Sequence, residues 1–218
     1  MKYVSFSLWS DKPIYNVGAL RNSELVKQFY PDWKMIVFHD LSVPKETIEL
    51  LKENSVETKL VQNSTYGMFW RFFSLELPDC EYSIFRDADS RISHRESLAV
   101  NEWIRSGKTL HVMRDHPFHK IPAGTNQLSI LGGMWGIKNK VYPIIEMMHR
   151  FGGLTEHKYG NDQSFLRYIY EMIGSDKITH DEFFENRPFP IKRENGRFIG
   201  ERIDEKENPV TDDFKLVL

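Results

Sequence analysis

The chain has 218 residues, with 29 Lys and Arg against 31 Asp and Glu, so its formal net charge is −2. A nearly neutral chain has no extended basic surface, which argues against a protein whose main partner is nucleic-acid phosphate. Hydrophobic residues make up 40% and aromatic residues 13% of the chain, which is too apolar for a disordered protein. The single cysteine, Cys80, excludes an internal disulfide framework and a multi-cysteine metal site.

Over the first half of the chain, short apolar runs alternate with stretches in which apolar residues recur at helical spacing. The apolar runs predict strands at residues 3–8, 35–38, 56–61, 82–85 and 109–113. The helical spacing predicts helices at residues 19–29, 44–51 and 68–75, and from 93 to about 106. Asn16 is the expected cap of the first helix, and Ser93 with Glu96 three residues later is a capping-box signature for the last.

The second half begins with residues 114–129, which are rich in His, Pro, Gly, Asn and Gln and predict a long loop. A strand is expected at residues 132–138, helices at 143–151 and 162–173, and a last short strand at 177–180. Asn195-Gly196 between residues 191–194 and 197–199 predicts a β-hairpin. Residues 201–213 are polar and mostly acidic, and 214–218 form an apolar tail.

The alternation predicts an α/β fold with a mixed, mainly parallel sheet flanked by helices. We expect one domain over residues 1–185, with the hairpin and tail of residues 186–218 packed on it or leading to further sequence. Ligands of such sheets bind beyond the carboxyl ends of the strands. The residues that follow the predicted strands are therefore the candidates for a functional site.

The sharpest candidate is Asp87-Ala88-Asp89, directly after the strand at residues 82–85. Two carboxylates at the mouth of a buried strand suit an oxygen-seeking divalent cation, which can bridge the oxygens of a diphosphate. Arg86 and Arg91 would add positive charge near those phosphates. Roughly one Asp-x-Asp is expected by chance in a chain of this composition, so a capped loop with solvated aspartates stays open.

Three further motifs carry a functional and a structural interpretation each. Arg71, amid bulky apolar residues, either meets an anionic partner or extends over a core helix to solvent. Gly132-Gly133 marks either the close approach of a ligand or tight sheet packing. Asp162 either caps a helix, or holds a sugar hydroxyl or takes a proton from an acceptor.

The histidines give weaker signals. His116 and His119 have no obvious third ligand nearby in the sequence, which favours solvated loop histidines over a zinc site. His180 ends the last predicted strand and is either a structural histidine or a further ligand for the cation at the aspartates.

The order of these motifs resembles the nucleotide-sugar glycosyltransferases of the GT-A fold. The matching motifs are residues 67–71 on a helix, Asp87-Ala88-Asp89 after a strand, Gly132-Gly133, and Asn161-Asp162-Gln163. The pattern is closest to the galactosyltransferase and glycogenin group and to compact bacterial and chlorella-virus enzymes, and it covers about residues 1–185. The C-terminal His-x-x-Gly-x-x-Lys-Pro-Trp segment of the relatives is absent, and Leu131-Gly132-Gly133 replaces their usual Asn-Ser/Ala-Gly.

The resemblance implies that Asp87 and Asp89 bind Mn²⁺ or Mg²⁺ and, through it, the donor diphosphate, with His180 as a hypothetical third ligand. The expected donor-binding residues follow the strand ends and the four motifs: Ser7, Leu8, Trp9, Arg71, Arg86, Asp87, Ala88, Asp89, Arg91, Gly132, Gly133 and Gln163. If the reaction inverts the anomeric centre, Asp162 is the first candidate for the base and Asp115 the second. If it retains the configuration, Asp162 and Gln163 position the donor sugar instead.

We therefore expect a transferase that moves a sugar from a nucleoside diphosphate sugar, most simply a UDP-sugar, to an acceptor hydroxyl such as that of a glycan. A haloacid-dehalogenase-like phosphatase with Asp87 as nucleophile and a non-catalytic nucleotide-sugar-binding module remain as alternatives. The N-terminus has no signal-peptide pattern, and no window approaches the roughly 18–20 uncharged apolar residues of a membrane span. We expect a cytoplasmic protein, of a bacterium or of a virus-infected host cell.

Overall fold

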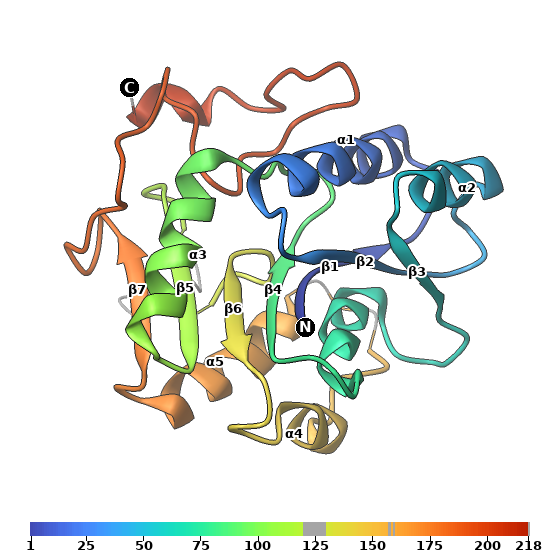
Figure 1. The fold of residues 1–218 in the computed structure, drawn as a ribbon, viewed down its shortest axis with the longest axis horizontal. Helices are drawn as coiled ribbons and strands as arrows, with labels where there is room; N and C mark the ends of the chain where they lie inside the picture. Colours follow the sequence, from blue (N-terminus) through green and yellow to red (C-terminus); the bar gives the residue numbers. More distant parts are fainter. Residues whose placement is uncertain (120–129, 157, 159, 218) are drawn as a thin grey trace.

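The computed structural model describes residues 1–119, 130–156, 158 and 160–217. The described strands form one sheet with the order β3-β2-β1-β4-β6-β5-β7 (Figure 1). Their bounds are β1 Lys2–Leu8, β2 Lys34–His39, β3 Glu57–Leu60, β4 Tyr82–Arg86, β5 Leu110–Arg114, β6 Trp135–Lys138 and β7 Lys177–Asp181. The sheet is parallel except for β6, which runs antiparallel to both β4 and β5. The expected mixed, mainly parallel α/β sheet is confirmed.

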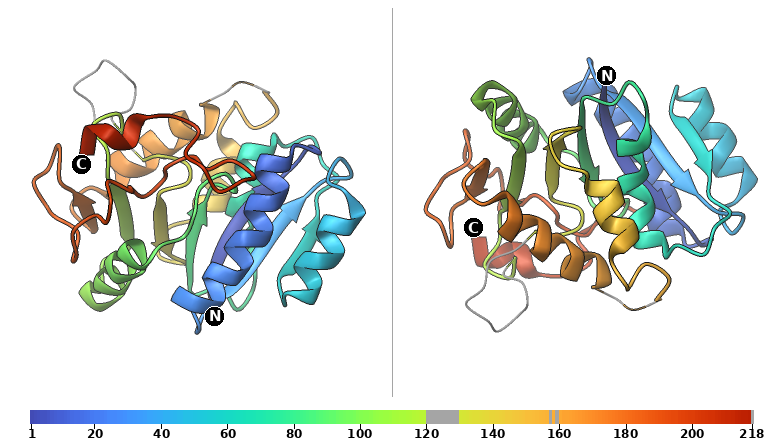
Figure 2. Two further views of the ribbon diagram at one scale, coloured as in Figure 1. Left: turned by 90° about the horizontal axis from the view of Figure 1, so that it is seen from above. Right: turned by 90° about the horizontal axis from the view of Figure 1, so that it is seen from below.

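Helices cover both faces of this sheet, as the two views in Figure 2 show. One face is covered by α1 (Pro13–Phe29), α2 (Lys45–Glu53) and α3 (His94–Ser106). The other is covered by the 3₁₀ helix η1 (Gly67–Glu76), α4 (Ile144–Arg150) and α5 (Asn161–Ile173). A short 3₁₀ helix, η2 (Asp213–Val217), lies near the C-terminus. Among the described residues, no helix has the length and apolar character that crossing a membrane requires.

The antiparallel β6 explains how two separate loops reach the same edge of the sheet. Because β6 runs against its neighbours, its first residue, Trp135, pairs with Phe85 near the carboxyl end of β4. Gly132 and Gly133, which precede β6, therefore come to the edge where β4 delivers Asp87 and Asp89. Residues from distant parts of the sequence meet there.

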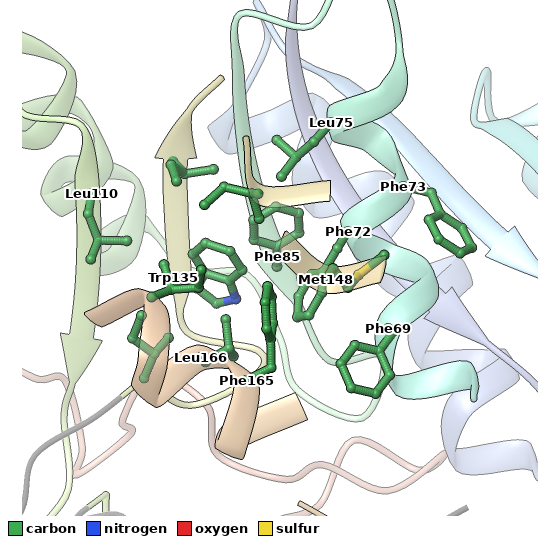
Figure 3. Packing of buried hydrophobic residues seen from close by; sticks show 14 of the residues in the cluster. Phe69, Phe72, Phe73, Leu75, Phe85, Leu110, Trp135, Met148, Phe165 and Leu166 are labelled. Carbon is green, nitrogen blue, oxygen red and sulfur yellow. The ribbon is translucent and has the colours of Figure 1, made fainter. Parts of the chain in front are cut away.

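The core beneath this edge is aromatic (Figure 3). The ring centroids of Phe85 and Trp135, on neighbouring strands, are 4.3 Å apart. Phe72 of η1 meets both rings in edge-on geometry, with centroids 5.1 Å from Phe85 and 5.3 Å from Trp135. Pairs of this kind contribute about 0.5–1.5 kcal/mol each beyond their buried area, so they hold η1 firmly against the sheet.

Three predicted helices and strands differ from the structure in their start or type. α1 begins at Pro13 rather than near residue 19, because proline fits the first turn of a helix, where its missing N–H is not needed. Residues 68–75 are helical as expected, but as part of the 3₁₀ helix η1. The predicted strand at residues 132–138 is shorter and starts at Trp135. Residues 120–129 of the predicted long loop lie outside the described residues.

The predicted C-terminal hairpin is wrong in its strands, although its turn forms. Asn195 and Gly196 have φ of 51° and 70°, and the Arg197 N–H donates to the Glu194 carbonyl over 3.0 Å. The flanking residues form no β-ladder. Ile199 instead donates its N–H to Asp115 at the end of β5, over 3.0 Å. The backbone after the turn is thus hydrogen-bonded to the edge of the sheet and not to a hairpin partner.

The segment after β7 runs along the carboxyl edge of the sheet, where it forms the upper border of the molecule in Figure 1. Phe189 and Ile199 of this segment are buried in a small apolar cluster with Met113 of β5 and Met134. Ile203 is also buried and donates its N–H to the Asp89 carbonyl over 2.7 Å. The C-terminal residues therefore pack directly against the candidate site.

Candidate active site

Arg71 is held in place by the first strand. Strand β1 alternates serines with apolar residues, and Ser5 and Ser7 point toward η1. The Arg71 N–H donates to Ser7 Oγ over 2.8 Å, and Ser5 Oγ donates to the Arg71 carbonyl over 2.6 Å. Ser7, expected to contact the donor, thus supports Arg71. Leu8 points the opposite way, and its side chain is buried in the apolar cluster that contains α1 residues.

The Arg71 guanidinium lies between two carboxylates and is only 4% exposed. It donates to Asp87 Oδ1 and, over 3.0 Å, to Asp162 Oδ2. Burial alone lowers the pKa of Arg71, but Asp87 and Asp162 outweigh this effect and the net pKa is raised. The guanidinium therefore stays charged, and Arg71 has the anionic partners that its burial requires.

Gly132 and Gly133 lie against this cluster. A Cβ at Gly132 would overlap the Asp162 carboxylate and the Arg71 guanidinium. A Cβ at Gly133 would overlap the Asp87 carboxylate. The two glycines thus allow the close approach of the backbone to three charged side chains of the chain itself, and the close approach of a ligand stays a prediction.

Asp162 lies at the start of α5 but does not cap it. The cap position is Gly160, without a side-chain hydrogen bond, and Asp162 lies within the first turn. Its side chain is 1% exposed, and its Oδ1 accepts the Gln163 N–H over 2.9 Å. Burial raises the pKa of Asp162 against the opposing effect of Arg71, with a further rise from Asp87. The helix-cap interpretation is therefore wrong.

Asp89 is paired with an arginine that sequence reasoning missed. Arg202 Nε donates to Asp89 Oδ2 over 2.8 Å, from a position 113 residues further along the chain. Burial raises the pKa of Asp89, as does the charge of Asp87, while Arg202 opposes the shift. No spacing in the sequence links Arg202 to Asp89. The only signal is that Ile199 and Ile203 are apolar residues four apart in a polar stretch, which indicates a docked segment.

The donor set fits a hard divalent cation. Asp87 and Asp89 supply carboxylate oxygens, and Mg²⁺ in proteins is commonly held by one or two carboxylates together with substrate phosphates. The three carboxylates Asp87, Asp89 and Asp162 exceed the two guanidiniums Arg71 and Arg202 by one negative charge. Within the described part of the chain, no group of three or more His, Cys, Asp and Glu side chains is arranged around a metal position.

Trp9, directly after β1, forms an aromatic surface with the start of η1. Its ring centroid lies 6.2 Å from Tyr66 and 6.0 Å from Trp70, and a Cβ at Gly67 would come within 2.8 Å of the Trp9 ring. Trp9 and Tyr66 are partly exposed. The structure therefore places Trp9 next to the element that carries Arg71.

Arg86 and Arg91 do not face the cluster of Arg71. Because side chains alternate along β4, Arg86 points to the face covered by α3, where it is buried and pairs with Glu96 over 2.9 Å. Arg91 pairs with Glu207 over 2.8 Å and donates to the Ala88 carbonyl, and Ala88 itself is buried. The expectation that the two arginines contact the donor is corrected: Arg86 stabilises the core, and Arg91 ties the aspartate loop to the C-terminal segment.

Asp115 is fully buried, and both of its oxygens accept hydrogen bonds. Arg95 donates to both oxygens over 3.1 and 2.9 Å, Arg193 to Oδ1 over 2.6 Å and the Ile199 N–H to Oδ2 over 3.0 Å. The expectation that Asp115 is an alternative base is therefore corrected. It holds the C-terminal segment to the end of β5.

His180 is not brought to the aspartates either. Three strand spacings of about 4.8 Å each separate β7 from β4. The His180 ring is buried, its Nδ1 shares a 2.9 Å hydrogen bond with His111 Nε2, and its Nε2 faces Glu102 at 3.4 Å. The hypothesis of a third metal ligand at His180 is therefore wrong.

The expectation of solvated loop histidines is wrong for His116, and His119 is half-buried. His116 is 1% exposed and hydrogen-bonded to the Asp213 carbonyl over 3.0 Å. His119 Nδ1 accepts the Asp115 N–H over 3.0 Å, and burial lowers the pKa of His119 to about 3. Both side chains thus help to hold the end of β5 and the C-terminal residues together.

Solved structures share this architecture. Residues 1–349 of TarS from S. aureus match with a TM-score of 0.58 and 13% identity over 86% of this chain and 59% of that chain. The mannosyltransferase PcManGT from Pyrobaculum calidifontis, in complex with GDP-Man and Mn²⁺, matches with a TM-score of 0.52 and 15% identity over 84% and 55%. Glucosyl-3-phosphoglycerate synthase from Mycobacterium tuberculosis, with Mg²⁺ and UDP, matches with a TM-score of 0.52 and 13% identity over 83% and 69%.

The comparisons reach no further than the fold. No family model matches the chain, and no curated protein matches it by sequence. The chain spans less than two thirds of the TarS and PcManGT chains. A similar fold also occurs in 4-diphosphocytidyl-2C-methyl-D-erythritol synthase from Anaerococcus prevotii, with a TM-score of 0.51 and 10% identity over 83% of this chain and 87% of that chain. One fold can support different chemistries, so the side chains of the site decide which reaction the protein performs. By its architecture, the chain has the GT-A fold of nucleotide-sugar glycosyltransferases.

Proposed function

We propose that this protein is a metal-dependent glycosyltransferase that moves a sugar from a nucleoside diphosphate sugar, a UDP-sugar in the simplest case, to an acceptor hydroxyl. One observation carries the proposal. Arg71 pairs with Asp87 from the carboxyl end of β4 and with Asp162 from the start of α5. Gly132 and Gly133, which have no side chains, lie directly against these three charged groups. The site lies at the carboxyl edge of a mainly parallel sheet, where α/β proteins bind their ligands.

Asp87 and Asp89 would hold the cation. When bound there, a divalent cation supplies positive charge that stabilises the departing diphosphate. Arg71 would bind and orient the donor diphosphate, because its buried guanidinium remains charged beside the two aspartates. A buried cation interacts with an anionic ligand far more strongly than one in water. Trp9 and Tyr66 offer partly exposed rings for the flat face of a base.

Asp162 is the candidate for the proton transfer or for holding the sugar. Its carboxylate is buried, oriented by the Gln163 N–H and by Arg71, and its pKa is raised by burial. A carboxylate with a raised pKa is a better proton acceptor from an alcohol than a solvated one. In an inverting reaction Asp162 takes the acceptor proton, and in a retaining one it positions the donor sugar. Both assignments stay open.

The two alternatives make different demands on the site. A phosphatase needs Asp87 as a free nucleophile, whereas Asp87 Oδ1 accepts a hydrogen bond from Arg71 here. A non-catalytic module needs the nucleotide-sugar contacts but no proton acceptor, so in such a module Asp162 would serve only as a partner of Arg71. Slow release of UDP from a UDP-sugar in the presence of Mn²⁺ separates a transferase from a binding module.

A thermal-shift experiment tests the proposal. UDP and GDP are added to the full chain with and without Mn²⁺, and ligand at about 100 times its Kd adds roughly 2.7 kcal/mol of stability, or about 5–10 °C. We expect the shift to need both the nucleotide and Mn²⁺ and to be larger with UDP. Asp87→Asn and Asp89→Asn should abolish it. Asp32→Asn, at an exposed position, is the charge-matched control and should keep it. A shift that is unchanged in Asp87→Asn contradicts the metal site.

A further inference from the structure

The C-terminal segment brings a positive charge to the very carboxylate that is proposed to bind the cation. Arg202 Nε lies 2.8 Å from Asp89 Oδ2. We propose that Arg202 is a built-in competitor of the divalent cation at Asp89, which weakens the binding of the free cation and makes cation binding depend on the nucleoside diphosphate. The inference rests on the proposed function and concerns a residue outside the motifs of the sequence.

The backbone beside Arg202 is held by several contacts, and the Arg202 side chain is half-exposed. Ile203 is buried and donates its N–H to the Asp89 carbonyl over 2.7 Å. Arg91 donates to the Asp204 carbonyl over 3.2 Å and pairs with Glu207. These contacts hold the segment on the aspartate loop. The Arg202 side chain is 54% exposed, so it can leave Asp89 while the backbone stays in place.

The charges give Arg202 a reason to move. With the cation absent, the Asp89 carboxylate is largely buried next to the negative charge of Asp87, and Arg202 offsets part of this repulsion. With a divalent cation held by Asp87 and Asp89, Arg202 would be a third cationic group beside Arg71 and the metal. A half-exposed ion pair is weak, so a dication can displace it. A diphosphate next to the metal would then be an anionic partner within the reach of the released guanidinium.

This arrangement predicts two changes in an Arg202→Gln variant. The competitor for Asp89 is lost, so Mn²⁺ alone should bind more tightly, by about fivefold, which corresponds to about 1 kcal/mol. The partner for the diphosphate is also lost, so UDP should increase the Mn²⁺ affinity less in the variant than in the wild type. A residue with a merely structural role would change both Mn²⁺ affinities by the same factor, or neither of them, and would leave the effect of UDP on the Mn²⁺ affinity unchanged.

The experiment titrates Mn²⁺ into the full chain by calorimetry, with and without UDP, for the wild type and three variants. Arg202→Lys keeps the charge and should stay close to the wild type. Arg105→Gln removes the same charge from an exposed position at the C-terminal end of α3, whereas the aspartate loop precedes the N-terminal end of this helix. This variant should change neither affinity. The melting temperature of each variant shows that it is folded.

The outcomes are distinguishable. Tighter binding of Mn²⁺ alone together with a smaller effect of UDP in Arg202→Gln supports the inference. Unchanged or weaker binding of Mn²⁺ alone in that variant overturns it, even if the wild type binds Mn²⁺ and UDP as the proposed function requires. If the wild type binds no Mn²⁺ with or without UDP, the proposed function and the inference both fail.

Discussion

At the scale of single residues, Gly133 offers a test of the site in which no charged side chain is replaced. A Cβ there would overlap the carboxylate of Asp87, so Gly133→Ala must displace a proposed metal ligand. Overpacking of this kind costs about 1–3 kcal/mol, so we expect the Kd for UDP with Mn²⁺ to rise roughly 10- to 100-fold. Calorimetry on the purified variant measures this.

Gly152→Ala is the matched control, because a Cβ at Gly152 meets nothing within 4 Å and its φ is not positive. It should bind UDP and Mn²⁺ as the wild type does. Wild-type affinity in Gly133→Ala would instead show that the Asp87 carboxylate is free to move without loss, and it would remove Gly133 from the donor site.

Asp115 is the residue whose expected role the structure changes most. Its carboxylate is fully buried between Arg95 and Arg193. Removal of one partner from a buried ion pair costs about 3–5 kcal/mol, so Asp115→Ala should lower the free energy of unfolding by about that amount. Urea denaturation measures the loss. Near-wild-type stability with a large fall in turnover would return Asp115 to the candidate bases.

At the scale of elements, the parallel pair β5 and β7 carries a buried histidine pair that makes stability depend on pH. His111 Nε2 and His180 Nδ1 are 2.9 Å apart, and the His111 ring stacks on Trp103 of α3. Burial, reinforced by His180, lowers the pKa of His111 well below its ordinary value. Burial also lowers the pKa of His180, although Glu102 opposes this shift.

The sign of the effect follows from proton binding. The unfolded chain binds a proton at His111 below about pH 6.5, and the folded chain does not. Stability is therefore fully present above about pH 6.5 and falls as the pH decreases. Each such histidine adds up to about 1.4 kcal/mol per pH unit to the slope of the free energy of unfolding against pH. Between pH 7 and 5.5, the stability of His111→Gln should fall less steeply than that of the wild type, by about 1 kcal/mol per pH unit near pH 5.5. Equal slopes would mean that His111 does not resist protonation in the fold.

Much of the site could be predicted from the pattern of elements. Short apolar runs mark the strands, and in a mainly parallel sheet the residues that follow β1 and β4 must meet at one edge. That rule selects Trp9, Asp87 and Asp89 without knowledge of any contact. Gly132 and Gly133 could be singled out because glycines in a strand pattern mark close approach, and the structure shows which groups approach.

Two features could not be predicted from the sequence: the face of the sheet that the ligand uses, and the ion pairs between segments that lie far apart in the chain. The direction of Arg86 follows from side-chain alternation along β4, which also takes Ile84 to the α3 face, but the sequence does not say which face the ligand uses. The Arg202–Asp89 and Arg193–Asp115 pairs join segments more than 75 residues apart and have no local signature. The strong Asn195-Gly196 turn suggests a hairpin. Local turn chemistry does not reveal that the flanking residues form tertiary contacts instead of a β-ladder.

At the scale of the whole molecule, the C-terminal residues complete the sheet edge. They supply Arg193 and the Ile199 N–H to Asp115, and Arg202 to Asp89. Gly200 packs so closely that a Cβ there would come within 2.6 Å of the Met134 sulfur, just before β6. The segment thus stabilises the strand ends that carry the site, and its removal tests whether residues 1–185 are a self-sufficient unit.

A chain that ends at residue 185 should therefore lose most of its stability. It lacks the buried side chains of Phe189, Ile199 and Ile203, each of which contributes about 1.5–3 kcal/mol. It also leaves Asp115 buried with fewer partners. The combined loss approaches the roughly 5–15 kcal/mol by which whole proteins are stable.

A chain that ends at residue 210 keeps all of these contacts and is the matched control. Urea denaturation followed by circular dichroism should show a cooperative transition for the longer chain and none, or one at far lower urea, for the shorter. A cooperative transition of nearly full stability at residue 185 would instead make the C-terminal segment an appendage and would separate the stability of the fold from the Arg202 contact.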